Sequence, residues 1–172
     1  METVQDLFTR ADYLRLPEGF PAELLEGCLV KEPSPTYGHQ RILATVLQRL
    51  LALVGPSRAL PAPVEVGIDE LNVFQPDVAV LRRLPPLDSS DVGIPLLVVE
   101  VLSPSTGERD REVKTHHYLE AGVAEVWLVD PEAESVEIHA RDGVTTARGR
   151  EAARSVALPG FDLTPEVLFS PP

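Results

Sequence analysis

Apolar residues recur at steps of three and four between Gly38 and Val54, which is the spacing of one buried face of an α-helix. The pair Gly55-Pro56 follows directly, and both residues are typical of a helix end. We therefore predict an amphipathic helix over residues 38–54. The positions that define its apolar face are Ile42, Leu43, Val46, Leu47, Leu50, Leu51 and Val54.

The N-terminal part of the chain predicts a shorter helix and a hairpin. Thr3 to Tyr13 has the pattern of a short opening helix. Two strand-like runs, Ala22 to Leu25 and Cys28 to Glu32, flank the turn Glu26-Gly27, so an antiparallel hairpin is the simplest arrangement. A further run with β-like composition lies at Ala62 to Ile68.

The middle of the chain predicts a strand, a helix and another strand. Leu96 to Leu102 is apolar along almost its whole length, which is typical of a central strand buried on both faces. Ser105 and Glu108 have the spacing of a capping box, so a helix is expected over residues 105–121. Glu125 to Val129 then predicts the second strand. Such a unit normally joins parallel strands through a right-handed crossover.

Two further patterns complete the expected sheet. Asp77 to Leu81 has the composition of a short strand. Residues 136–140 alternate between apolar and polar side chains, which indicates a strand with one wet face, and Asp142-Gly143 is a turn into a partner strand. Parallel and antiparallel pairs together predict a mixed sheet.

Length and composition predict one cytoplasmic domain over residues 1–172. Cys28 is the only cysteine, which excludes an intrachain disulfide and suits a reducing compartment. The first residues lack the pattern of a signal peptide. The longest apolar stretch, Ile42 to Val54, is interrupted by Gln48 and Arg49 and is shorter than the roughly 20 residues that cross a bilayer, so no membrane segment is expected.

The net charge of −12 opposes tight, non-specific binding of nucleic acid, because polyphosphate is repelled. A nuclease would need basic residues gathered locally or metal ions at the scissile phosphate. Lys31 and Lys114 are the only lysines among fifteen basic residues, so a lysine is unusual in this chain. No P-loop, dinucleotide fingerprint, serine elbow or HExxH motif occurs, and those enzyme classes are excluded.

Two acidic residues interrupt strands that are otherwise apolar. Asp77 opens one predicted strand, and Glu100 lies inside another. A buried carboxylate without compensation costs several kcal/mol, so each should meet a cation, hydrogen-bond donors or a metal ion. On the helix that follows Glu100, the residues Arg111, Lys114 and Tyr118 are spaced to share one face.

This set of residues suits hydrolysis of a phosphodiester bond, which needs a hard cation, oxygen ligands and a charged group beside the attacking water. Asp77 and Glu100 are the candidate ligands of Mg²⁺ or Mn²⁺, together with the main-chain carbonyl of Val101. Lys114 is the candidate for the third role, since its ammonium is a compact point charge. Each residue taken singly has an ordinary structural interpretation, as an ion-pair partner, a turn cap or a solvated lysine.

Several segments of the chain resemble the Uma-type restriction endonucleases. The resemblance covers most of the chain in the family's order. Its segments are Glu26-Gly27, His39, Pro76-Asp77, Val98 to Thr106, Asp110-Arg111, Lys114, Tyr118, Gly122-Val123, Val126 to Pro131 and Leu158 to Phe161.

The resemblance implies membership of the PD-(D/E)XK nuclease superfamily: an α/β, restriction-endonuclease-like fold whose central mixed sheet is flanked by helices, and a magnesium-dependent phosphodiesterase site at the strand ends. The leading hypothesis is a Mg²⁺- or Mn²⁺-dependent endonuclease that acts on DNA. In that pattern Asp77 is the aspartate, Glu100 the second acid and Val101 the variable position. The usual lysine position is Leu102, and Lys114 on the following helix matches a relocated lysine.

The resemblance also marks Glu26, His39 and Tyr118 as supporting residues, and it implies assembly into a homodimer or a larger homo-oligomer. Two alternatives stay open. One is an inactive relative that keeps the nuclease fold as a binding or assembly module. The other is a phosphodiesterase for small nucleotides, which the negative charge favours because a small substrate meets only the local field. The choice of DNA or RNA, the recognition sequence and the physiological metal also stay open.

Overall fold

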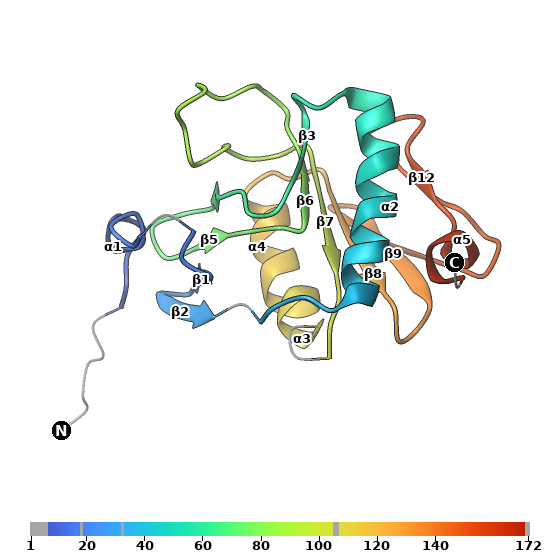
Figure 1. Cartoon of the computed structure of the whole chain (residues 1–172), viewed down its shortest axis with the longest axis horizontal. Helices are drawn as coiled ribbons and strands as arrows, with labels where there is room; N and C mark the ends of the chain where they lie inside the picture. Colours follow the sequence, from blue (N-terminus) through green and yellow to red (C-terminus); the bar gives the residue numbers. More distant parts are fainter. Residues whose placement is uncertain (1–6, 18, 32, 105–106, 171–172) are drawn as a thin grey trace.

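A mixed six-stranded β-sheet forms the centre of the fold (Figure 1). The computed structural model describes residues 7–17, 19–31, 33–104 and 107–170, and within them this sheet has the strand order β10-β9-β8-β7-β6-β3. β7 and β8 are parallel and the other neighbouring pairs are antiparallel, which confirms the predicted mixed sheet. The strands are β3 (Ala59–Pro61), β6 (Val78–Val80), β7 (Leu97–Val101), β8 (Glu125–Asp130), β9 (Ser135–Ala140) and β10 (Gly143–Arg148).

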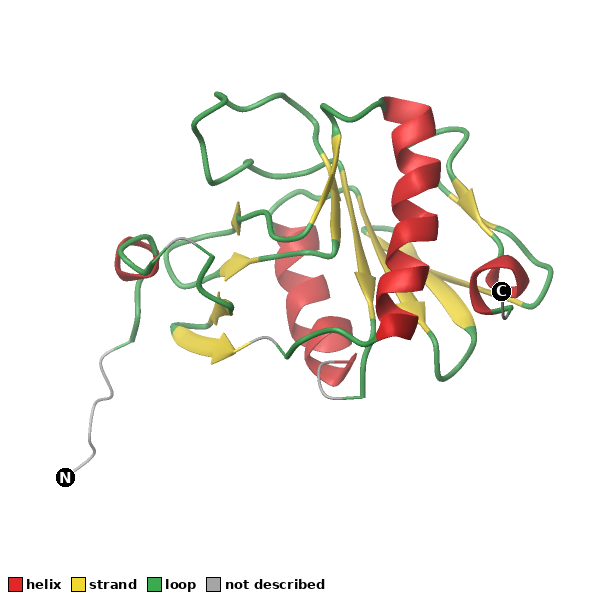
Figure 2. Cartoon of the chain, in the orientation of Figure 1, coloured by secondary structure: helices red, strands yellow, loops and turns green. Residues whose placement is uncertain are grey.

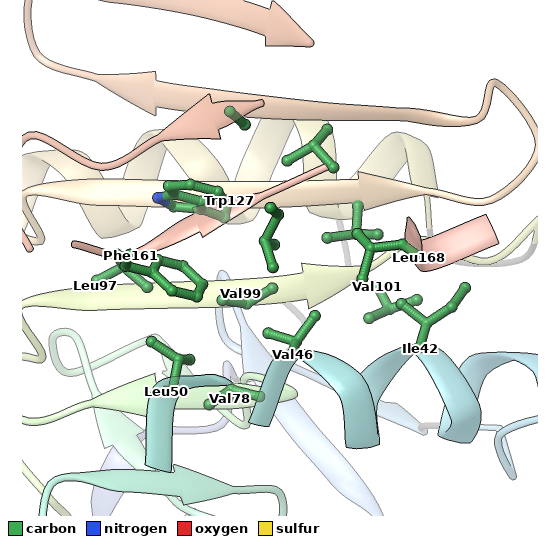
Figure 3. Close-up of a cluster of buried hydrophobic side chains, with 14 of the residues drawn as sticks. Ile42, Val46, Leu50, Val78, Leu97, Val99, Val101, Trp127, Phe161 and Leu168 are labelled. Carbon is green, nitrogen blue, oxygen red and sulfur yellow. The ribbon is translucent and has the colours of Figure 1, made fainter. Parts of the chain in front are cut away.

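The two central strands are buried on both faces, as the apolar runs predict. Val99 and Trp127 pack in the cluster that includes the buried face of α2 (Tyr37–Val54). Val98 and Leu128 lie on the opposite face, in a cluster with Tyr118. Figure 3 shows the first cluster, with labels on Ile42, Val46, Leu50, Val78, Leu97, Val99, Val101, Trp127, Phe161 and Leu168.

α2 is the helix predicted over residues 38–54, and it begins one residue earlier. Thr36 caps it, because its hydroxyl accepts a hydrogen bond of 3.2 Å from the backbone N–H of His39. Gly55 ends it with a φ of +80°, in the region where a side chain would be strained.

The second long helical segment differs from the regular helix that the sequence predicts. It consists of α3 (Gly107–Arg109), a π-helical segment (Asp110–Lys114) and α4 (Thr115–Glu120). The predicted cap residue Ser105 lies outside the described residues. π-helical turns are rare and occur often at functional sites, because the wider turn redirects side chains. The spacing of apolar residues along the sequence does not predict a π-helical turn.

A second, smaller sheet has the order β2-β1-β5-β4 among the described residues. It contains β1 (Ala22–Leu25), β2 (Cys28–Lys31), β4 (Val66–Gly67) and β5 (Val73–Phe74). β1 and β2 form the predicted hairpin, with Leu25 opposite Cys28. In Figure 2 these short strands lie to the left of the six-stranded sheet.

Two predictions about local structure are wrong. The strand expected over residues 62–68 is reduced to Val66–Gly67, and Pro63 within this run cannot donate to a strand ladder. The opening helix expected from residue 3 is α1 (Arg10–Tyr13), and residues 7–9 are not helical. Thr9 caps α1 by accepting a hydrogen bond from the backbone N–H of Asp12, which sets the helix start.

The C-terminal part covers the same face of the main sheet as α2. Phe161 packs on Trp127, with 4.8 Å between the ring centroids. The elements here are β11 (Ala153–Arg154), β12 (Asp162–Leu163) and α5 (Pro165–Phe169). Among the residues that the structure describes, no helix combines the length and the apolar character that crossing a membrane requires.

Glu125, at the start of β8, ties the main sheet to the segment before β12. Its carboxylate is buried and accepts hydrogen bonds from Trp127 Nε1 (2.9 Å) and Ser155 Oγ (2.6 Å). It also accepts bonds from the backbone N–H groups of Val156 (2.7 Å) and Ala157 (2.9 Å). Burial alone would raise the pKa of Glu125, but the donors, with Ser155 and Ala157 the strongest, lower the pKa below its ordinary value.

We predict that Glu125→Gln lowers the free energy of unfolding at pH 7 by about 2–4 kcal/mol, because the carboxylate is replaced by an amide that cannot satisfy all four donors. The ionised group stabilises the fold above its unfolded-state pKa of about 4.3, and this contribution is lost as the pH falls through the lower folded-state value. Urea unfolding followed by far-UV circular dichroism at pH 7 and below pH 4 should show the difference shrinking in acid. The exposed Glu151→Gln is the matched control. A difference that does not change with pH would contradict this account.

Candidate active site

Asp77 and Glu100 face each other across two neighbouring strands. The register pairs Val78 with Val99, so one further step places Asp77 opposite Glu100. Cβ atoms of such opposite residues are roughly 5 Å apart. The backbone N–H of Val101 donates to Asp77 Oδ2 at 2.7 Å, and the backbone N–H of Asp77 lies 3.4 Å from Glu100 Oε2. The structure therefore brings both predicted acids to the same end of the sheet.

Lys114 lies directly beside Glu100. Its Nζ is 2.8 Å from Glu100 Oε1, and the side chain of Lys114 is only 3% exposed. The same oxygen of Glu100 accepts a hydrogen bond of 3.0 Å from the Tyr118 hydroxyl. The ammonium also lies 5.7 Å from the centre of the Phe74 ring. The helix thus supplies both a positive charge and a hydroxyl donor to a buried carboxylate on β7.

Leu102, at the position where the resemblance expects a lysine, is part of the apolar packing of the sheet. Leu102 is buried in the apolar cluster that contains Val98 and Tyr118, on the face of the sheet that α4 covers. A lysine there would remove apolar packing and place a charge in that cluster. Lys114 reaches the end of the same strand from the helix that packs on this face.

Burial is the main reason that the pKa of Tyr118 lies well above its ordinary value, and the negative charge of Glu100 adds to the effect. The nearby Lys114 opposes this shift without reversing it. The phenol therefore stays protonated at neutral pH. It remains a hydrogen-bond donor to Glu100 and is not a base.

Glu23 completes the group, and the sequence patterns did not single it out. It lies on β1, its side chain is 1% exposed, and its Oε1 is 2.9 Å from Lys114 Nζ. The same oxygen accepts a bond of 2.6 Å from the backbone N–H of Gln75. Arg109 Nη2 lies 3.8 Å from the other oxygen of Glu23. The sequence feature that could have identified Glu23 is its position as a carboxylate inside the apolar run of residues 22–25, which is the same pattern that marks Glu100.

Of the three supporting candidates, Tyr118 and His39 join the site and Glu26 does not. His39 lies in the first turn of α2, with Nε2 3.2 Å from Asp77 Oδ2. Glu26 occupies the turn of the β1–β2 hairpin with a φ of +49°, and its side chain is 67% exposed. Its carboxylate lies 3.6 Å from His117 Nε2 and does not line the cleft described next.

An open cleft of ≈ 1350 Å³ lies at this end of the sheet and is lined by Asp77, Glu100, Val101, Lys114 and His39. Acidic side chains outnumber basic ones among its described lining residues. The basic ones are Arg41, Arg111 and Lys114, and the acidic ones are Asp77, Glu100, Glu108, Asp130, Glu132 and Glu134. The cleft therefore has a negative field before any cation binds.

The two arginines of the cleft already have partners. Arg41 donates to the main-chain carbonyls of Leu168 (3.1 Å) and Ser170 (3.0 Å). Arg111 pairs with Asp130 at 2.9 Å and with Glu137. An anionic ligand would have to compete with these partners for either guanidinium group.

The chemistry of the donors fits a hard cation that keeps part of its water. Among the described residues, no group of three His, Cys, Asp or Glu side chains is placed to enclose a metal ion. Mg²⁺ typically takes one or two carboxylates, carbonyl oxygens and water. Asp77 is 18% exposed, and none of the described residues donates a hydrogen bond to its Oδ1. Asp77, Glu100 and the Val101 carbonyl could thus hold such an ion.

Comparison with known proteins identifies a family and a similar solved structure. The sequence model of the Uma2 family, described as "Putative restriction endonuclease", matches residues 10–166. The crystal structure of a putative nuclease belonging to DUF820 from Anabaena variabilis matches with a TM-score of 0.79 and 23% identity, and the match covers 94% of this chain and 97% of that chain. At this identity the second match shows a shared fold. No curated protein matches the chain.

We predict that Tyr118→Phe costs about 1.5–3 kcal/mol of unfolding free energy, because it removes a hydrogen bond to a buried charged group. Tyr37→Phe is the control. Tyr37 is 78% exposed, so removal of its hydroxyl is expected to change the free energy of unfolding by no more than about 0.5 kcal/mol. Urea unfolding of both variants at pH 7 measures the two costs. An equal or smaller cost for Tyr118→Phe would show that Glu100 does not depend on the phenol.

Proposed function

This chain belongs to the Uma2 family of putative restriction endonucleases, and we propose that it is a divalent-metal-dependent endonuclease that hydrolyses phosphodiester bonds of DNA. The observation that carries the proposal is the contact between Lys114 and Glu100 beside Asp77 at an open cleft. A lysine and two acids at one strand end are the groups that this hydrolysis needs.

In this proposal Asp77 and Glu100 hold the cation together with the Val101 carbonyl. Mg²⁺ or Mn²⁺, when bound, supplies a Lewis acid that polarises the phosphate and acidifies a water molecule. Lys114 orients the attacking water and stabilises negative charge on the phosphate oxygens. Tyr118 and His39 position the two acids through their contacts with Glu100 and Asp77.

The acidic lining of the cleft favours a second candidate, a phosphodiesterase for small nucleotides. A long polyphosphate meets the field of the whole protein, whose net charge is −12, whereas a small substrate meets only the field of the cleft. Both candidates use the same residues for the same bond cleavage. They differ in substrate size, which a substrate series separates.

We predict that the purified chain cuts supercoiled plasmid DNA with Mg²⁺ or Mn²⁺ and not with EDTA. Asp77→Asn and Glu100→Gln should each lower the cleavage rate by about 100-fold or more, since a neutral amide holds a hard divalent cation less well than a carboxylate. Asp88→Asn, an exposed acid in the loop after β6, should cut at the parent rate.

The substrate series is plasmid DNA, single-stranded RNA and bis(p-nitrophenyl) phosphate. Cleavage of the small ester alone would support the second candidate, and cleavage of RNA alone would overturn the choice of DNA. If no substrate is cut with either metal, the enzyme proposal fails. A binding or assembly module that retains the nuclease fold then becomes the better interpretation.

We further predict that DNA binding depends on a divalent ion, because the cleft is acidic and its arginines are already paired. With Ca²⁺ as a probe ion, the dissociation constant for a labelled oligonucleotide should be about tenfold lower than with EDTA at matched ionic strength. Fluorescence anisotropy measures it. The double variant Asp77→Asn, Glu100→Gln should lose the response to Ca²⁺. Equal affinity with Ca²⁺ and EDTA would contradict a role for the two acids in holding the ion.

A further inference from the structure

Lys114 lies between two buried carboxylates that come from different sheets. Its Nζ is 2.9 Å from Glu23 Oε1, on β1 of the small sheet, and 2.8 Å from Glu100 Oε1, on β7 of the main sheet. Glu23 and Glu100 are 1% and 5% exposed in their side chains. Two negative groups therefore share one ammonium in a region with little access to water.

Stability alone does not require this arrangement. Glu100 and Lys114 already form a neutral pair, and a second buried carboxylate adds a desolvation cost of several kcal/mol. An apolar residue at position 23 would suit its neighbours Ala22, Leu24 and Leu25 on β1. Buried ion pairs are often replaceable by apolar residues without loss of stability. The second carboxylate therefore needs another explanation.

Glu23 is itself rigidly held. The backbone N–H of Gln75 donates to its Oε1 at 2.6 Å, directly after β5. β1 pairs with β2 over four residues and with β5 at Leu24, which fixes the backbone on both sides of Glu23. Arg109 Nη2 lies 3.8 Å from its second oxygen. This carboxylate is thus a fixed acceptor at which a flexible lysine can be held.

The path of the helix brings Lys114 to that acceptor. Lys114 is the last residue of the π-helical segment, and Thr115 begins α4. Lys114 and Tyr118, four residues apart, both contact Glu100 Oε1. Ordering a lysine side chain costs about 2 kcal/mol of rotamer entropy. Because the Glu23 carboxylate already holds the Lys114 side chain in one conformation, this cost does not fall on the step in which substrate binds.

We propose that Glu23 is a positioning residue that holds the Lys114 ammonium beside the reacting phosphate when Glu100 ligates the metal ion. The inference rests on the proposed function. A carboxylate that ligates a cation holds a neighbouring ammonium less strongly, because the two positive charges repel each other. Glu23 keeps the ammonium in place because its own oxygen is held by the backbone and not by the ion.

The first test is kinetic. Glu23→Gln should lower kcat on plasmid DNA with Mg²⁺ by about 10- to 100-fold and leave KM within twofold, since DNA and metal contacts are unchanged. In a Lys114→Ala background the same substitution should change kcat no further, because the two residues act as one unit. Glu26→Gln, on the adjacent hairpin turn, should match the parent. An unchanged kcat for Glu23→Gln, or an equal further loss without Lys114, would overturn the proposal.

The second test does not depend on nuclease activity. Lys31 is exposed and Lys114 is buried, and they are the only lysines. With Ca²⁺ present, acetylation by an N-hydroxysuccinimide ester, read by mass spectrometry, should modify Lys114 about tenfold more slowly than Lys31 in the parent. Glu23→Gln should raise the rate at Lys114 severalfold and leave Lys31 unchanged. If Lys114 is acetylated equally slowly in the parent and in the Glu23→Gln variant, Glu23 does not hold the ammonium. This outcome would contradict the proposal even if the chain cuts no substrate.

Glu23→Asp covers the case in which Glu23→Gln does not fold. It keeps the charge and shortens the side chain by one methylene, so the carboxylate is drawn back from Lys114. An intermediate kcat and intermediate protection of Lys114 are expected. Parent values for both would overturn the proposal.

Discussion

The site depends on the ion pairs that the Lys114 ammonium forms with Glu23 and Glu100. Glu23 and Glu100 are both buried, and each would be costly without a cation nearby. Lys114 contacts both carboxylates, with 2.9 Å and 2.8 Å between the charged atoms, and Arg109 lies 3.8 Å from Glu23. The same contacts join β1 of the small sheet, β7 of the main sheet and the helix. The local fold and the chemistry of the site therefore rest on the same three residues.

Much of the fold could be predicted from sequence because burial leaves a local pattern. Helix α2, the β1–β2 hairpin and strands β7 and β8 all follow from apolar spacing or from unbroken apolar runs. The pattern fails where elements are very short. β4 and β5 have two residues each, which is too few to show a period, and proline breaks the run that precedes β4.

The candidate site could be predicted only in part. Asp77, Glu100 and Lys114 stand out because each is unusual in its own segment, and the structure brings them together at one cleft. Glu23 is separated from Lys114 by 91 positions, so no local spacing connects the two. The resemblance marked Glu26 as a supporting residue, but the carboxylate of Glu26 lies beside His117 and outside the cleft. The π-helical segment also depends on tertiary contacts that periodicity does not report.

The residues of the candidate site lie far apart along the chain, which determines the stage of folding at which the site is complete. Its members come from β1, from the start of β6, from β7 and from the helix beyond it, and they meet across two different sheets. During synthesis on the ribosome, Glu23 emerges 91 positions before Lys114, and Glu100 also precedes Lys114. A nascent or partly unfolded chain would therefore expose carboxylates but lack an assembled reaction centre. For the proposed nuclease, folding of the chain would therefore have to be complete before any phosphodiester bond could be cut.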